Sequence, residues 1–272
     1  MKHPCTFEIG FLLLVIALSL TGFSSLFSAD RAGPSAFQLM HIVTSLAWLT
    51  LLLTQLVAIR QRRFDRHRAI GMSVFFAAPV LVASMVLLSA HSAAKDAVLG
   101  RADVMVVQNV MVTLELALLV LLAFALRRNR AIHGALMLST ALLFMGIALF
   151  FTLISYVPGY RIEGPETFYR FAKAAQATAY AGGIVGLLFF ARNWRTGWPW
   201  LLAGSFFFIN GFVQMIVARN DGTRALTALV ASIDPWPAFG MGLLIFSALL
   251  WMAWRVKPGA GMALGSSRQG AL

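Results

Sequence analysis

The chain has 272 residues, of which 60% are hydrophobic and only 12% are charged. A soluble globular domain is about 45–50% apolar and about 25% charged, so this composition excludes an ordinary soluble fold. A helix needs about 20 apolar residues to cross about 30 Å of hydrocarbon. The chain contains eight such stretches joined by short connections. We therefore expect an all-α, polytopic transmembrane helix bundle that forms a single domain over residues 1–257.

The expected spans are, in chain order, about 9–27, 36–59, 69–90, 104–126, 134–157, 174–191, 198–218 and 235–254. The first one, Ile9 to Phe27, is longer than the apolar region of about 7–15 residues in a secretory signal peptide. We expect it to be retained; cleavage near Ser28-Ala29 would leave seven spans in the same orientation. The Gly- and Ser-rich segment 258–272 is expected to be a disordered cytoplasmic tail.

The net charge of +12 is concentrated at one end of the expected spans. Arginines gather after the second, fourth and sixth spans, at Arg60, Arg62, Arg63, Arg66, Arg68, Arg127, Arg128, Arg130, Arg192 and Arg195. Cytoplasmic loops carry an excess of Lys and Arg. This pattern predicts a protein of the bacterial inner (cytoplasmic) membrane with both termini in the cytoplasm. We expect the basic face to contact anionic lipid or partners in a membrane complex, and we expect no nucleic-acid partner.

A repeating arrangement runs through the central spans. Nineteen residues before the first arginine of each cluster lies a polar residue: His41, Gln108 and Lys173. This spacing predicts three like-oriented helical hairpins (spans 2–3, 4–5 and 6–7), flanked by spans 1 and 8. The positive-inside rule places the arginines that anchor this alignment whether or not the chain contains a true internal duplication, so both explanations stay open.

Polar residues at matched depths define a candidate ligand- or proton-binding site on spans 2, 4, 6 and 7: Glu115, Tyr180, Asn210, Gln108, His41, Lys173 and Gln176. Glu115 lies about 18 Å from the cytoplasmic end of its helix, near the bilayer midplane. A carboxylate there costs about 2.5–3.5 kcal/mol, so it must face the interior, find donors or be protonated. We expect Glu115 to be the protonatable centre of a cavity that binds or transfers a small ligand, a quinone for example, or protons. The alternative is a neutral Glu that only links helices.

Histidines offer a second function. His67 and His133 open the third and fifth spans beside arginines, and two imidazoles on facing helices suit a b-type haem electron carrier; the alternative is two interfacial polar residues. His41 and His91, with Asp96, offer an external metal site, although the metal-ligand spacings of known motifs are absent.

The one cysteine, Cys5, excludes an intrachain disulfide. No catalytic residues are predicted, and the third alternative is a non-catalytic structural subunit.

Two basic turns resemble those of a known family. The segment from His41 to the turn Asp65-Arg66-His67-Arg68-Ala69-Ile70-Gly71 resembles an uncharacterised family of bacterial multi-spanning membrane proteins that carry a His-Arg-x-x-Gly turn after a His-bearing helix. The turn ending at His133 is similar to that family's second basic turn, in which a basic residue and an aromatic follow the histidine, whereas Gly134 and Ala135 follow here. The resemblance covers about 36–157. It implies the multi-spanning fold and marks His41, His67 and His133; it implies no function.

Overall fold

The computed structural model describes residues 5–27 and 33–255, and these residues form ten α-helices and two short 3-10 helices. Eight of the described helices are long and apolar enough to span a membrane. This confirms the expected all-α, multi-spanning fold. The eight are α1 (Thr6–Ser24, extended by the 3-10 turn Ser25–Phe27), α2 (Ala36–Arg60), α4 (Val74–Val98), α5 (Val106–Ala125), α6 (Arg130–Tyr156), α7 (Arg170–Arg192, preceded by the 3-10 turn Pro165–Thr167), α8 (Trp198–Arg219) and α10 (Pro235–Arg255).

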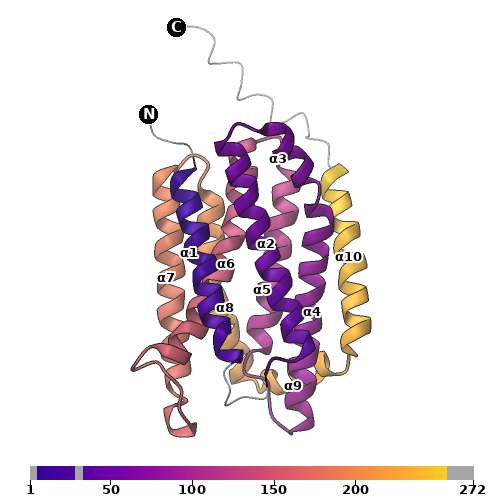
Figure 1. Cartoon of the computed structure of the whole chain (residues 1–272). Coiled ribbons are helices and arrows are strands. Elements are labelled where there is room, and N and C mark those ends of the chain that lie inside the picture. Colours follow the sequence, from indigo (N-terminus) through magenta and orange to yellow (C-terminus); the bar gives the residue numbers. More distant parts are fainter. Residues whose placement is uncertain (1–4, 28–32, 256–272) are drawn as a thin grey trace.

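Two short helices mark opposite ends of the bundle (Figure 1). Helix α3 (Phe64–Gly71) joins α2 to α4 at one end, and α9 (Gly222–Ala231) joins α8 to α10 at the other. We refer to these as the α3 end and the α9 end. The expected tail at 258–272 and the expected cleavage point at Ser28-Ala29 lie outside the described residues.

The third span is displaced from its expected place at about 69–90, because it runs from Val74 to Val98. The preceding residues fold separately as α3, a helix that buries none of its side chains. Only Met72 and Ser73 separate the two helices, so the sequence contains no clear break between them. His67 therefore lies on α3, whereas His133 lies in the first turn of α6, and the two histidines do not occupy equivalent positions.

The three expected hairpins are present as packed pairs, α2 with α4, α5 with α6 and α7 with α8. In each pair the first helix runs from the α9 end to the α3 end (Figure 1). Helix α1 packs against α6 and α2, and α10 packs against α4 and α5. Helices α4 and α6 have the largest buried share of the eight, so they form the centre of the bundle.

Close helix approach depends on glycine at a few positions. A Cβ at Gly22 of α1 would lie 2.6 Å from the carbonyl oxygen of Ala148 on α6, and one at Gly186 of α7 would lie 2.7 Å from that of Trp200 on α8. Both distances are too short for a real side chain. Gly182 and Gly186 form the spacing that lets membrane helices approach closely, and here that spacing brings α7 against α8.

Candidate functional site

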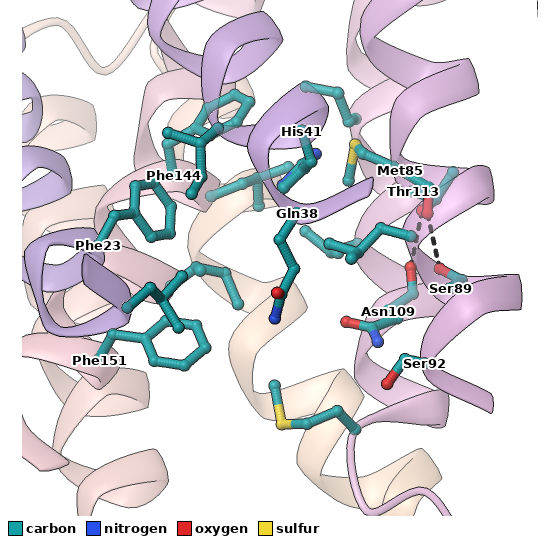
Figure 2. Close-up of a pocket in the computed structure, with 18 residues that line it drawn as sticks. Phe23, Gln38, His41, Met85, Ser89, Ser92, Asn109, Thr113, Phe144 and Phe151 are labelled. Carbon is teal, nitrogen blue, oxygen red and sulfur yellow. Dashed lines mark hydrogen bonds between the residues drawn. The ribbon is translucent and has the colours of Figure 1, made fainter. Parts of the chain in front are cut away.

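A cavity of about 210 Å³ lies between α1, α2, α4, α5 and α6, in the half of the bundle nearer the α9 end. Figure 2 shows the side chains that line it. The cavity has two chemically different walls. Helices α1 and α6 contribute Phe23, Phe144 and Phe151, whereas α2, α4 and α5 contribute the polar residues, Gln38, His41, Ser89, Ser92, Asn109 and Thr113. The site is therefore apolar and aromatic on one side, and on the other side its polar groups are mixed with apolar side chains such as Met85, Val112 and Leu116.

Several polar groups of this wall already have partners. Thr113 donates its hydroxyl to the Asn109 carbonyl oxygen at 2.7 Å, and Ser89 donates to the Met85 carbonyl oxygen at 2.8 Å. The oxygen of the Gln38 side chain accepts from the backbone N–H of Ser35 at 2.8 Å, which completes a capping box at the start of α2. These bonds fix the wall and leave its remaining polar atoms for other partners.

His41 is held only loosely. Its Nδ1 lies 3.4 Å from the Ser84 hydroxyl and its Nε2 lies 3.5 Å from the Ser45 hydroxyl, both long for hydrogen bonds. The side-chain amide of Asn109 and the hydroxyl of Ser92 make no hydrogen bond to any described residue. The Asn109 side chain is half-buried and borders the cavity, so its amide can donate a hydrogen bond to an occupant or accept one from it.

A polar recess of about 420 Å³ adjoins the cavity toward the α9 end, and Gln38 and Ser92 line both spaces. The recess also contains His91, Lys95, Asp96 and Arg101. Arg101 and Asp96 form an ion pair at 3.0 Å, and Lys95 has no ion-pair partner among the described residues. Together the two spaces form one amphipathic site, with a charged mouth and a mostly apolar interior.

Of the seven residues predicted to form the site, only His41 lines this cavity. Glu115 and Asn210 meet elsewhere, between α5 and α8, where the Asn210 amide donates to Glu115 Oε2 at 3.2 Å. Gln108 lies two turns before Glu115 on the same face of α5. The cavity found in the structure is thus not centred on Glu115, because α5 turns Asn109 and Thr113 toward the cavity and Glu115 toward α8.

The other three predicted residues lie on the exposed face of α7. Lys173 places its Nζ 4.9 Å from the centre of the Tyr160 ring, and Gln176 donates to the Tyr180 hydroxyl at 3.3 Å. Helix α7 instead buries its small residues, Ala174, Thr178, Gly182 and Gly186. Helical spacing identifies which residues share a face, but not the direction in which that face points.

His67 and His133 both lie at the α3 end. The Nδ1 of His133 bonds the Ala123 carbonyl oxygen at 2.8 Å, and the side-chain amide of Gln55 contacts Nδ1 of His67. Burial lowers the pKa of the His67 imidazole; the nearby His133 and Arg68 lower it further, while a backbone hydrogen bond with Gln55 opposes the shift. In both rings Nε2 makes no hydrogen bond to a described residue.

A metal site built from His41, His91 and Asp96 does not form. His41 lines the cavity, whereas His91 and Asp96 line the recess. Over residues 5–27 and 33–255, no group of three or more His, Cys, Asp or Glu side chains is arranged to hold a metal ion.

Sequence reasoning did not identify Gln38, Ser89, Ser92 and Asn109 as site residues. The available signal was a set of small polar side chains within apolar helices, three of them near the α9 end of their span. The repeat spacing to Arg127 points to Gln108 and not to its neighbour Asn109. One residue along a helix turns a side chain by about 100°, so that spacing indicates the wrong face of α5.

Comparisons of this chain with protein-family models, with curated proteins and with solved structures give no match. The resemblance of the basic turns at His67 and His133 therefore stays a prediction, and function is argued from the site itself.

Proposed function

We propose that this integral membrane protein binds a small, lipid-soluble ring compound that carries carbonyl or hydroxyl oxygens, of the quinone class. The observation that carries the proposal is the unpartnered amide of Asn109, which lines a cavity walled on its other side by Phe23, Phe144 and Phe151. An aromatic wall favours a flat apolar ring. An amide and an imidazole opposite it supply hydrogen bonds to ring oxygens.

The volume limits what the cavity holds. A cavity of about 150 Å³ is sufficient for benzene, whereas drug-sized ligands occupy about 300–1,000 Å³. At about 210 Å³, this cavity fits one substituted ring and no long chain. A longer substituent would extend into the adjoining recess beside Gln38 and Ser92.

The charge pattern supports a direction of access. With the arginine clusters at the α3 end in the cytoplasm, the cavity and its recess open toward the periplasmic side of the bacterial inner membrane. In this orientation both termini are cytoplasmic, and the basic α3 end faces anionic lipid. The ligand then enters from the outer half of the bilayer or from the periplasm.

Isothermal titration of the detergent-solubilised protein with a short-chain benzoquinone tests the proposal. We expect saturable binding at one site and about tenfold weaker binding for Asn109→Leu, because one hydrogen bond worth about 1.4 kcal/mol is lost. Leu114→Phe is the matched control, because Leu114 lies on α5 but is 60% exposed and outside the cavity. Absence of saturable binding would favour a structural subunit instead.

A b-type haem held by His67 and His133 is the second candidate function. The observation in its favour is that each ring is engaged through Nδ1, which is how histidines that ligate a metal through Nε2 are usually oriented. The absorption spectrum of protein from haem-replete cells, oxidised and dithionite-reduced, tests it. A sharp reduced α-band that is lost in His67→Ala and in His133→Ala would establish the haem, and a colourless protein would eliminate it.

A further inference from the structure

A second buried polar site lies between α5 and α8, outside the cavity. Glu115 and Asn210 are only 4% and 3% exposed, and the Asn210 Nδ2–H donates to Glu115 Oε2 at 3.2 Å. Glu115 lies near the middle of α5, about 14 Å from either end of the helix. The pair is therefore remote from water at both ends of the bundle.

The hydrogen bonding of this pair is incomplete in a specific way. Glu115 Oε1 and Asn210 Oδ1 are both buried, and neither has a hydrogen-bond partner among the described residues. An ionised carboxylate can only accept hydrogen bonds, so with Glu115 ionised neither of these two oxygens has a donor. A proton on Oε1 supplies that donor, because a carboxylic acid and a primary amide can form two hydrogen bonds to each other at once. One added proton thus satisfies both unpartnered oxygens.

No charged group compensates an ionised Glu115. The elements packed against α5 are α4, α6, α8, α9 and α10. The charged and titratable residues of these helices lie toward the helix ends: His91, Lys95 and Asp96 on α4, Arg130, His133 and Tyr156 on α6, Arg219 on α8, Arg224 on α9 and Arg255 on α10. Among the described residues, Glu115 takes part in no ion pair, and Asn210 is its one side-chain hydrogen-bond partner.

The surroundings of the pair differ along the seam between the two helices. Toward the α9 end, Gln108 lies on the same stripe of α5, and Gln214 of α8 donates to the Val104 carbonyl oxygen at 3.4 Å. Toward the α3 end, residues 116–125 of α5 are all apolar. The polar side chains along this seam therefore lie on the α9 side of Glu115, and its α3 side is apolar.

We propose that Glu115 and Asn210 form a proton-binding site, in which a neutral carboxyl is held by the amide and exchanges its proton toward the α9 end. This site is independent of the ligand cavity, because the two lie on different faces of α5. Its ligand is the proton; a sodium ion coordinated by the two unpartnered oxygens is the competing occupant.

Infrared spectroscopy of the reconstituted protein, with glutamate labelled by ¹³C at the side-chain carboxyl, tests the proposal. We expect a protonated-carboxyl C=O band at pH 7 that shifts with the label, disappears at alkaline pH and is absent in Glu115→Gln. The ¹³C label separates Glu115 from Asp103, another buried carboxyl with an unpartnered oxygen. Glu8→Gln is the matched control, because Glu8 is a partly buried glutamate paired with Arg192 at 3.8 Å and its removal should leave the band unchanged.

Two results would overturn the proposal. If the folded protein shows no labelled protonated-carboxyl band at pH 7, Glu115 is ionised. If the band is present in choline chloride and is lost in sodium chloride, the two oxygens hold sodium in preference to a proton. Titration of the Glu8→Gln protein decides both points even if Glu115→Gln does not fold, because Glu8 is the other described glutamate with a buried, unpartnered oxygen.

Discussion

The two faces of α5 carry similar polar residues in opposite states. On the cavity face, the Asn109 side chain has no partner among the described residues and borders a space of about 210 Å³. On the other face, Asn210 closes over Glu115 at 3.2 Å and both side chains are almost fully buried. A polar side chain without a partner, next to empty volume, can bind a small molecule. A buried hydrogen-bonded pair that lacks one donor can instead bind a proton.

This difference shows that polarity within a membrane helix is not by itself evidence of a ligand site. Burial of a polar group in hydrocarbon is costly whether it serves packing, protons or a ligand. What separates the cases is the free volume beside the group and the count of its unmet donors and acceptors. Each prediction below changes one face of α5 or one end of the bundle and leaves the other unchanged.

Filling the cavity should have the largest effect. Val112 lines the cavity, so Val112→Phe places a ring where the ligand would lie. We expect the affinity for a short-chain benzoquinone to fall by about a hundredfold, or about 2.7 kcal/mol, while the free energy of unfolding changes by less than about 1 kcal/mol because the ring enters empty space. Titration calorimetry and denaturant unfolding measure the two quantities. Unchanged affinity would place the ligand elsewhere.

Breaking the closed pair should cost stability without affecting the ligand. Asn210→Leu leaves the carboxyl of Glu115 buried without a partner, so we expect the free energy of unfolding to fall by about 2 kcal/mol. Glu115→Leu combined with Asn210→Leu should recover most of that loss, since removal of both partners is far less costly than removal of one. Unfolding in detergent, followed by tryptophan fluorescence, measures the cycle. Simple additivity of the two substitutions would mean that they do not form one unit.

The recess should contribute a smaller, salt-dependent effect. Lys95 is exposed and lines the mouth, so Lys95→Gln should weaken binding of a ring compound with an anionic substituent by about two- to threefold. The affinity for the neutral benzoquinone should not change. Repeating the titrations at high ionic strength should remove the difference, because salt screens exposed charges. An equal loss for both compounds would argue against an electrostatic contribution.

The smallest expected effect is a change in the pH dependence of stability caused by His67, which lies at the α3 end and not on α5. Burial lowers the pKa of His67 below its ordinary value of 6.5. Since the unfolded chain then binds more protons than the folded one, the free energy of unfolding should decrease as the pH falls from about 6.5 toward the folded-state pKa. His67→Gln should reduce this slope, measured by unfolding between pH 7.5 and about 5. A slope unchanged by the substitution would assign it to another group.

The fold was largely predictable from the sequence. Eight apolar runs of membrane-spanning length and the arginine clusters after alternate runs correspond to the eight helices and three hairpins of the structure. The short helices α3 and α9 were not predicted, because neither has a long apolar run and α3 is separated from α4 by only two residues.

The site was much less predictable. Depth along each helix was estimated well enough to place Glu115 and Asn210 at one level, and the two side chains do meet. The direction of each face was not available, because it depends on which neighbouring helix offers small residues. Gly182 and Gly186 draw one face of α7 against α8, and this turns Lys173, Gln176 and Tyr180 outward.

The measurement that tests the central claim most directly compares quinone affinity in Asn109→Leu and Glu115→Gln, which change the two faces of α5 separately. The account predicts about tenfold weaker binding for Asn109→Leu and no change for Glu115→Gln, whose amide can replace the neutral acid against Asn210. The reverse result, with binding lost in Glu115→Gln and retained in Asn109→Leu, would contradict the assignment of the ligand to the cavity and return it to Glu115.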